Sequence, residues 1–595
     1  MRASQDAFHA AVLAVVEAET MAASLSRVLM SVGYLLGALG SGAGQARESE
    51  VSSGRVGRRQ VAPPRGGSRA VVSPGEEQGP RPSLVVFLVF DGLRYDDLER
   101  WRHRMAPGGF RRLLEGGTVF DSARYPYATT KTCPGHATLA TGALPGAHGI
   151  ISNEWYERET GADVSCVRDS ASPPLDDPKG KGVSPRRLRV ATLGDRLLET
   201  QGGASRVVSV SLKDRAAIML GGQRGQAYWW GTKGFTTSRH HARELPSWVS
   251  EWNQALGSQQ GGAWARGAEA SVYGSLGPDD DARERPPEGL GRTFPHPLTT
   301  EEAFLYTPLG AEKLFELALA GVKAERLGKR PGARDLLAIG MSSVDVVSHS
   351  FGPESHETVD MLLRLDRALA AFLEAMDREV GLSKVLVAMS ADHGMAPAPA
   401  RAEQRLSAET VTRAVDAAMD EAFGAEDWVE AFSAPHLYLR QARLKARGVS
   451  LEQAAEVAKK AARAVRGIAE AVSAADVSAD RAEGFARRVR QEYVPARSGE
   501  LVLIADPHVL LAPDDDHAST HGTPYEYDTH VPLVLYGQGL PAVRHGRAVT
   551  PLDLAPTLAT WLGVTLPEAS GLPLCEALPP RAGTPASCSE RAASR

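Results

Sequence analysis

A run of seven apolar residues, LVVFLVF at 84–90, constrains the fold of this chain more than any other segment. It follows Pro82 and ends at Asp91-Gly92. A short apolar run without polar alternation, bounded by a proline and a glycine turn, is typical of a strand buried on both faces of a parallel sheet. Because open α/β sheets bind ligands beyond the carboxyl ends of their strands, we expect Asp91 at a ligand site.

Similar strand-like runs alternate with helical patterns along the rest of the chain. Strands are expected at 206–211, 336–340, 384–390 and 531–536, and helices at 109–115, 191–200, 354–379 and 550–562. This alternation predicts an α/β fold with a mainly parallel central sheet and helices on both faces. Two segments interrupt the pattern, and we expect inserted cap subdomains at about 228–332, which contains five tryptophans, and about 400–512, which has α+β character.

The chain begins with a segment that resembles an export signal. A basic start near Met21 precedes the apolar run 28–39 and small residues up to Ala46, which predicts a signal peptide whose true start can be Met21. The apolar run is short for a membrane span, so we expect no stable span and a periplasmic or secreted protein. Gly, Pro, Ser and Arg without periodicity predict a disordered linker over 47–82. The expected division is therefore 1–46, 47–82, a core domain at 83–575 and a C-terminal tail at 576–595.

Composition narrows the class of protein. With 43% hydrophobic and 23% charged residues, the chain has the balance of a folded soluble protein. A net charge of -5 and a pI near 6.4 give no electrostatic case for a nucleic-acid partner. Four cysteines are too few for a disulfide scaffold. Cys575 and Cys588 are close enough in sequence to pair in an oxidising compartment, whereas Cys133 and Cys166 can be free or bridged.

The segment 127–153 has a composition that burial alone does not require. It contains five threonines, four glycines, two prolines and two histidines. Pro134 disfavours helix at the residue before it, so we expect Thr132 at a chain reversal and the next helix from Ala137. The small residues allow close backbone approach, as a site for a tetrahedral anion requires.

Carboxylate and imidazole side chains recur where the expected strands end, at Asp91, Asp345, His349, Asp392, His393 and His521. Asp345 and His349 are four residues apart and share one face of a helical turn. Asp392 and His393 are adjacent at a strand end. Carboxylates and imidazoles without thiolates suit catalytic zinc. Three or four such groups around each of two ions would form a two-metal hydrolytic site.

The ordered motifs FDG, TKTCPGH, VDVVSH, SADHG and STHG resemble those of the alkaline phosphatase superfamily over residues 84–562. More narrowly, they resemble the bacterial single-Thr alkaline phosphatases related to the nucleotide pyrophosphatase/phosphodiesterases. The resemblance implies hydrolysis of phosphate monoesters at a site with two zinc ions per chain and a phospho-threonine intermediate on Thr132. It implies one zinc on Asp345, His349 and His521, and the other on Asp91, Asp392 and His393, with Thr132 joining the second when ionised.

The same resemblance places Asn153, Lys213 and Arg215 around the non-bridging phosphoryl oxygens, within ISNEW and SLKDRAA. A monoester dianion carries more charge than a diester, so two cations favour monoesters. A cysteine-dependent phosphatase would need an arginine six residues after Cys133, where Leu139 stands, so we interpret Cys133 as a packing residue.

Two other functions remain open from the sequence. A phosphodiesterase or nucleotide pyrophosphatase could use the same fold, and a zinc-binding pseudoenzyme could keep the ligands without turnover. A sulfatase would need Cys or Ser at the position of Thr132, in a C/S-x-P-x-R context that the chain lacks. The expected partners are small-molecule phosphate esters, and the sequence does not fix an oligomeric state.

Overall fold

The computed structural model describes residues 81–511, 516–578 and 588. The predicted signal peptide, the alternative start at Met21, almost all of the predicted linker and most of the predicted tail lie outside these residues. Among the helices of the described part, none is both long and apolar enough to cross a membrane.

A large sheet of nine strands forms the centre of the described chain. From one edge to the other its strands are β19 (Val543–Val549), β2 (Thr118–Ala123), β18 (Leu533–Gly537), β11 (Val385–Ser390), β1 (Leu84–Phe90), β10 (Asp335–Met341), β5 (Val207–Ser211), β6 (Gln226–Trp230) and β7 (Phe235–Thr236). Strands β18 and β7 run antiparallel to their neighbours, and the other pairs are parallel. The predicted mainly parallel α/β sheet is therefore confirmed.

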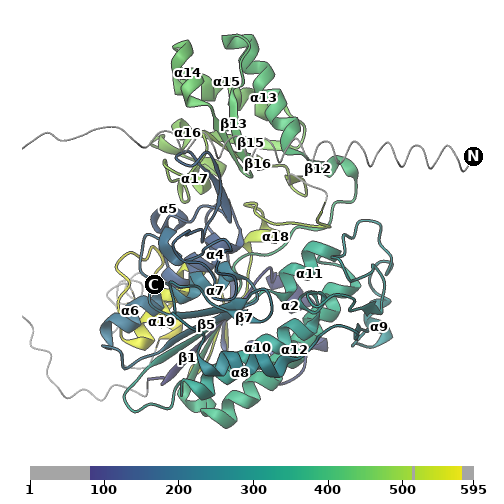
Figure 1. The fold of residues 1–595 in the computed structure, drawn as a ribbon, viewed down its shortest axis with the longest axis vertical. Helices are drawn as coiled ribbons and strands as arrows, with labels where there is room; N and C mark the ends of the chain where they lie inside the picture. Colours follow the sequence, from purple (N-terminus) through teal and green to yellow (C-terminus); the bar gives the residue numbers. More distant parts are fainter. Residues whose placement is uncertain (1–80, 512–515, 579–587, 589–595) are drawn as a thin grey trace, which may run out of the picture. The chain divides into compact units, whose positions relative to one another are not determined.

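Successive side chains of β1 point to opposite faces of the sheet, and all of them are apolar. Helices therefore cover both faces. Leu84, Val86, Leu88 and Phe90 belong to a core cluster that includes side chains of α10 (Pro308–Ala324) and α12 (His356–Glu379). Val85, Phe87 and Val89 belong to a second cluster with α6 (Leu193–Thr200) and α19 (Leu554–Leu562). Figure 1 shows these two helical layers on either side of the strands. Truncating a buried residue such as Leu88 to Ala would destabilise the fold by about 2–5 kcal/mol.

One edge of the sheet differs from the prediction. Strand β18 begins at Leu533 rather than 531 and runs antiparallel between β11 and β2. Strand β19 at the sheet edge was not predicted. Its side chains alternate between half-buried and exposed, so its sequence VRHGRAV lacks the apolar run that marks a central strand.

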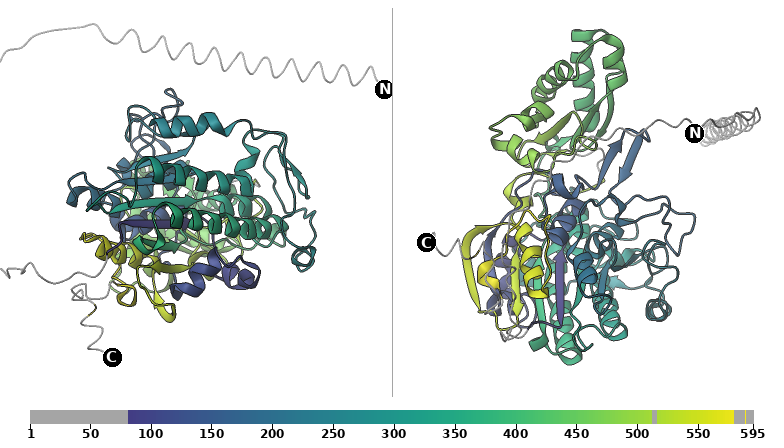
Figure 2. Two further views of the ribbon diagram at one scale, coloured as in Figure 1. Left: turned by 90° about the horizontal axis from the view of Figure 1, so that it is seen from below. Right: turned by 90° about the vertical axis from the view of Figure 1, so that its left-hand side faces the viewer.

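The second predicted insertion has its own four-stranded sheet, in the order β13 (Val429–Ser433), β14 (His436–Leu439), β16 (Leu501–Ala505) and β15 (Ile468–Ser473). Helices α13 (Ala408–Phe423) and α15 (Leu451–Ala464) pack on it through a separate apolar cluster. We call residues 408–505 the inserted lobe. Figure 2 shows it as a group of elements distinct from the main sheet.

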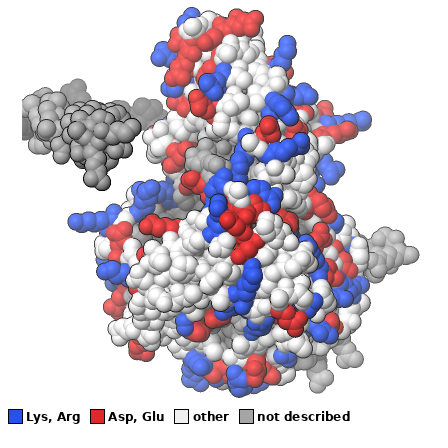
Figure 3. Space-filling view, turned by 90° about the vertical axis from the view of Figure 1, so that its right-hand side faces the viewer, with Lys and Arg blue, Asp and Glu red and all other residues white. Residues whose placement is uncertain are grey.

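The first predicted insertion, 228–332, is partly core. Strand β6 joins the main sheet, and α10 contacts β5 and β10. Between them lie α8 (Ser247–Leu256) and the short pair β8 (Ala263–Trp264) and β9 (His296–Pro297). On the face shown in Figure 3, basic and acidic side chains are interspersed. The absence of a nucleic-acid partner stays a prediction.

Candidate active site

Three carboxylates gather beyond the carboxyl ends of neighbouring strands. Phe90 of β1 pairs with Met341 of β10, and Val89 pairs with Ser390 of β11, so the three strands end close together. Asp91 follows β1, and Asp392 follows β11 by one residue. Asp345 lies in α11 (Ser343–Phe351), the helix that follows β10. All three side chains are buried, which places acidic groups at the sheet edge that the sequence predicted.

Two glycines permit the close packing of these segments. Gly92 has φ +73°, and a Cβ there would lie 3.0 Å from the Cα of Asp345. A Cβ on Gly135 would lie 2.3 Å from the carbonyl oxygen of Asp392. A larger residue at either position would therefore push the acidic segments apart.

Thr132 is the first residue of helix α4 (Thr132–Thr141). We expected a chain reversal here and a helix only from Ala137, because Pro134 disfavours helix at the residue before it. Pro134 is the third residue of α4, and the first N–H groups of a helix have no intrahelical partner in any case. The helix therefore starts five residues earlier than predicted, and Thr132 stands at its N-terminus.

Two groups of possible metal ligands share the imidazole of His393. In the first, Nε2 of His393 lies 3.3 Å from Oδ1 of Asp91 and 3.3 Å from Oδ2 of Asp392. In the second, one ligand atom each from Asp345, His393 and His521 lie within 4.8 Å of one another. Oδ1 of Asp345 is 3.7 Å from Nε2 of His521 and 3.4 Å from Nε2 of His349. The structure thus brings all six predicted Asp and His ligands together, while their division between two ions stays a prediction.

Backbone carbonyls orient the three histidines. Nδ1 of His349 lies 2.8 Å from the oxygen of Ser519, and Nδ1 of His521 lies 2.8 Å from that of Thr130. Nδ1 of His393 likewise lies 2.8 Å from the carbonyl oxygen of Gly394. A carbonyl accepts only, so each Nδ1 carries a proton, and Nε2 is the ring nitrogen that faces the carboxylates. This is the arrangement that holds metal-ligating histidines, and no sequence motif revealed it.

The buried carboxylates fit a divalent cation. Among the described residues, Oδ1 of Asp91 and Oδ1 of Asp345 have no hydrogen-bond partner although both atoms are buried. Buried polar atoms are nearly always paired, so these two oxygens are candidate ligands for a cation. Carboxylate oxygens and imidazole nitrogens without sulfur are a donor set that zinc accepts.

The charges of the site favour ionised ligands. Burial and Asp345 raise the pKa of Asp91, but Lys213 and His393 outweigh them and lower it to about 2. Burial also opposes ionisation of Asp345, yet His349 and Lys213 hold its pKa well below its usual value. Burial lowers the pKa of His393, but Asp392 and Asp91 raise it to about 9. Asp91 and Asp345 are therefore available as ligands at neutral pH, whereas burial and the charge of Asp91 raise the pKa of Asp392. His393 faces enough negative charge to attract a cation.

The predicted nucleophile and Asn153 lie beside these ligands. Oγ1 of Thr132 is 3.5 Å from Nε2 of His393 and is buried. Oδ1 of Asn153 accepts a 2.7 Å hydrogen bond from the backbone N–H of Cys133, the next residue of α4. The Asn153 side chain is thereby tied to the N-terminus of the helix that carries Thr132.

The predicted cations lie at the opening of the site. Nζ of Lys213 lies 2.6 Å from Oδ2 of Asp91 and also forms an ion pair with Asp345. Within the described chain, Nε of Arg215 is buried without a hydrogen-bond partner. Both residues line an open cavity of about 1010 Å³, which extends from Asp345 and His349 to Tyr306 and Glu284. The cavity leaves room for an ester group beside the ligands.

Sequence and structural comparisons agree on the relatives of this chain. A profile of the type I phosphodiesterase / nucleotide pyrophosphatase family matches residues 85–530. The chain belongs to this family. It is similar to the alkaline phosphatase PafA of Elizabethkingia meningoseptica, with 30% identity over 524 residues that cover 84% of this chain and 95% of the relative. It is also similar to a protein of Myroides odoratus named calcium-transporting ATPase, with 29% identity over 520 residues, 84% of this chain and 95% of that protein.

A solved structure of wild-type alkaline phosphatase PafA has the same fold as this family member. The TM-score is 0.77 at 29% identity, and the match covers 84% of this chain and 99% of PafA. The fold and the resemblance to alkaline phosphatases are therefore confirmed, and the family's phosphoester hydrolysis is the activity class of this chain. The family match runs past both Asp91 and His521, so it includes every predicted ligand.

The cysteines of this phosphodiesterase-family chain correct one interpretation. Cys133, expected as a packing residue, is bonded to Cys166. The strand pair β3 (Glu154–Glu157) and β4 (Ala162–Ser165) brings Cys166 back beside Asn153, where its N–H donates to the Asn153 carbonyl at 2.8 Å. Sequence could not reveal this pairing because the two cysteines are 33 residues apart. Cys575 and Cys588 are also bonded, a pairing that their proximity in sequence allowed.

Proposed function

We propose that this protein is a zinc-dependent phosphomonoesterase that uses Thr132 as its nucleophile. The observation that carries the proposal is the position of the Thr132 hydroxyl, 3.5 Å from the imidazole that two groups of possible metal ligands share. The alkaline phosphatases among the relatives support the same activity.

The residues present would hold two zinc ions. Asp345, His349 and His521 would hold one, and Asp91, Asp392 and His393 the other, with the oxygen of Thr132 completing the second set. Bound zinc would favour the ionised form of a coordinated hydroxyl and neutralise charge on the leaving oxygen.

Thr132 would attack the phosphorus in line with the leaving alcohol. The Oγ1–P bond forms as the ester P–O bond breaks, and the Thr132 proton is lost to solvent. The alkoxide takes up a proton as it leaves. Water then attacks the phospho-threonine, releases inorganic phosphate and restores the hydroxyl. No side chain other than Thr132 forms a bond to phosphorus, so the remaining site residues would act by holding the zinc ions or the phosphoryl group.

Three side chains would bind the non-bridging oxygens. The Oδ1 of Asn153 already accepts a hydrogen bond from Cys133, which leaves the amide N–H groups to donate to an anion. Lys213 and Arg215 line the cavity beside Asp345 and His349 and would supply two positive charges. A monoester dianion gains more from two cations than a diester monoanion does, so the pair favours monoesters.

A phosphodiesterase or nucleotide pyrophosphatase is the second candidate function, because the family profile carries that description.

We also propose that the protein is exported to the periplasm or the medium. Its two disulfides support this location, since such bonds persist in oxidising compartments.

Zinc removal and return test the proposal. We expect chelation to abolish hydrolysis of an aryl phosphate, and zinc to restore it as content rises to two ions per chain. His521→Asn should lower zinc content and activity together. His530→Asn is a matched control, because His530 is buried but its ring contacts the carbonyl of Asp121, Glu526 and Tyr95 rather than a predicted zinc ligand. Full activity after exhaustive chelation would show that the proposal is wrong.

A further inference from the structure

A buried glutamate of the inserted lobe binds the segment that precedes the nucleophile. Glu492 follows helix α17 (Gly484–Arg490) and is 1% exposed. Oε2 accepts hydrogen bonds from the N–H of Ala128 at 3.0 Å and of Thr129 at 2.7 Å. Oε1 accepts a third bond from the Thr129 hydroxyl at 2.7 Å. One carboxylate thus satisfies three donors of two successive residues.

The segment held by Glu492 leads directly to two groups of the candidate site. The carbonyl of Thr130, one residue further on, accepts from Nδ1 of His521 at 2.8 Å and so orients a predicted zinc ligand. The Thr130 hydroxyl donates to the carbonyl of Thr523 at 2.8 Å, which fixes the segment on its other side. Thr132, the proposed nucleophile, follows after Lys131. A shift of residues 128–130 would therefore move both the nucleophile and a ligand.

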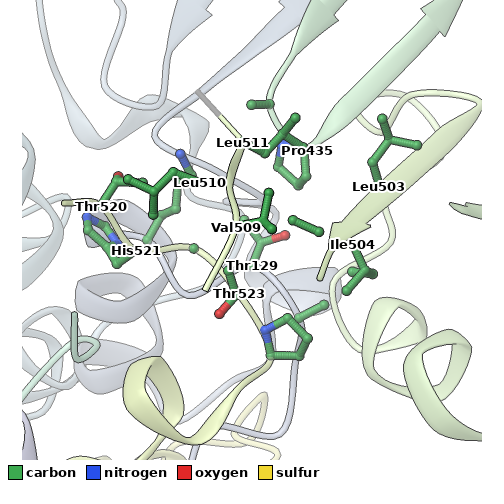
Figure 4. Close-up of a pocket in the computed structure, with 16 residues that line it drawn as sticks. Thr129, Pro435, Leu503, Ile504, Val509, Leu510, Leu511, Thr520, His521 and Thr523 are labelled. Carbon is green, nitrogen blue, oxygen red and sulfur yellow. The ribbon is translucent and has the colours of Figure 1, made fainter. Parts of the chain in front are cut away.

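Other contacts of the lobe fix the same region. Nη1 of Arg488 donates to the carbonyl of Tyr125 at 3.1 Å, and the carbonyl of Gln491 accepts from Gly146 at 2.9 Å. Figure 4 shows Thr129 and His521 lining a cavity together with Pro435, Leu503 and Ile504 of the lobe. This cavity has a volume of only about 30 Å³, so the lobe packs closely behind the segment.

We propose that Glu492 is a positioning residue for phosphoryl transfer. It fixes the backbone of residues 128–130 by three hydrogen bonds, and through that backbone it sets the places of Thr132 and His521. The inserted lobe is on this account a part of the active-site framework. The proposal rests on the proposed function in taking Thr132 as the nucleophile and His521 as a zinc ligand.

The chemistry of Glu492 supports a specific role. Burial raises the pKa of its carboxyl to about 7, even though the Thr129 and Ala128 donors act in the opposite direction. A contact needed for packing alone could be made by an apolar side chain without this burial of an acid. Because a displacement of about 1 Å between reacting groups costs roughly a hundredfold in rate, exact placement by three hydrogen bonds has a direct catalytic value.

The test compares Glu492→Ala with Glu492→Gln in the zinc-loaded full-length protein. We expect the Ala variant to lose about 10- to 100-fold in kcat with a smaller change in KM, and to release zinc faster to a chelator because His521 loses its support. The Gln variant can still accept from both N–H groups and can donate to the Thr129 hydroxyl. It should therefore keep kcat within about threefold of the wild type, by the same hydrogen-bond argument.

Glu500→Ala is the matched control. Glu500 is also a buried acid of the lobe, but it binds Arg158, Gln441 and the N–H of Leu439 rather than the nucleophile segment. Its loss should lower the thermal midpoint without the specific loss of kcat. Glu492→Ala with wild-type kcat, an equal loss in Glu500→Ala, or an equal loss in Glu492→Gln would each overturn the proposal.

Thr129→Ala keeps the test decisive if Glu492→Ala does not fold. It removes one of the three bonds, and we expect a loss of kcat of about threefold, while an unchanged kcat and zinc release would contradict the proposal. All variants are compared on an aryl phosphate and on its methyl diester. If the wild type hydrolyses only the diester, the proposed monoesterase function fails, yet the same ratios on the diester still decide the role of Glu492.

Discussion

Nζ of Lys213 lies 2.6 Å from Oδ2 of Asp91, where strand β1 ends. The same ammonium group also forms an ion pair with Asp345, so one cation faces carboxylates of both ligand groups. Burial lowers the pKa of Lys213, but Asp345 and Asp91 outweigh it and raise the pKa above its ordinary value. Lys213 therefore keeps its charge at alkaline pH, which a residue that binds a phosphoryl dianion requires.

Loss of both predicted phosphate-binding cations should harm monoesters more than diesters. Removing preorganised charge from a sheltered site costs around 3 kcal/mol, or roughly a hundredfold in rate. We expect Lys213→Ala with Arg215→Ala to lower kcat/KM for an aryl phosphate by at least that factor, and for its methyl diester far less. Equal losses on both substrates would mean that the two residues hold the fold or the ligands instead.

The proposed nucleophile can be tested by two substitutions at one position. Thr132→Ala removes the attacking oxygen and should abolish most monoesterase activity while zinc and phosphate still bind. Thr132→Ser keeps the oxygen and should retain substantial activity. Mass spectrometry of acid-quenched protein should find a phosphate on the wild-type peptide that contains Thr132. Near wild-type turnover by the Ala variant would assign the attack to water or to another residue.

The Cys133–Cys166 disulfide should support both the fold and the site. It joins α4 to the segment beside Asn153, whose side chain binds the Cys133 N–H. Chain-entropy arguments for a loop of 33 residues give a stabilisation of about 3–4 kcal/mol. We expect Cys133→Ser with Cys166→Ser to lower the thermal midpoint and to raise KM for an aryl phosphate.

The second disulfide provides the control for that experiment. Cys575 and Cys588 lie outside α4 and the strands next to Asn153. Replacing both by Ser should lower the thermal midpoint without changing KM. If KM also stays at the wild-type value in the Cys133 and Cys166 variant, the first disulfide has no role in positioning Asn153.

Glu492 should make stability depend on pH. Burial raises its folded pKa from 4.5 to about 7, so the folded state binds the proton more tightly than the unfolded state does. Stability from this group is complete below pH 4.5 and is lost as pH rises towards 7. Glu492→Gln removes the effect and should be more stable than the wild type by up to about 3 kcal/mol at pH 8, from 1.36 kcal/mol per pKa unit.

Urea unfolding of both proteins at pH 5 and pH 8 measures this difference. Arg488 is the charged group that faces Glu492 and lowers its pKa, so Arg488→Met should widen the gap between the two proteins at pH 8. A constant difference between wild type and Gln variant at the two pH values would contradict the raised pKa.

Much of the core was predictable from sequence because the physics there is local. The run before Asp91 is apolar at every position, as a strand buried on both faces must be, and the structure makes it the central β1. The four-residue spacing of Asp345 and His349 predicted a shared helical face, and α11 confirms it. These patterns need no knowledge of distant partners.

The parts that sequence missed depend on contacts between distant residues. The start of α4 at Thr132 is one example, since a proline in the first helical turn looks the same as a proline in a loop. The carbonyls that orient the histidines are another, because every residue carries a carbonyl and Ser519 or Thr130 has no distinguishing pattern. Glu492 lies more than 360 residues from Thr129, and only the fold brings them together.

The account depends most directly on the preference of the zinc-loaded wild-type enzyme for monoesters. The decisive measurement is kcat/KM for an aryl phosphate and for its methyl diester, in the same protein at the same pH. We predict that the monoester is hydrolysed with the higher kcat/KM, because on the proposed function Lys213, Arg215 and Asn153 would surround a dianion. A higher kcat/KM for the diester would contradict the account and would identify the protein as a phosphodiesterase of the same family.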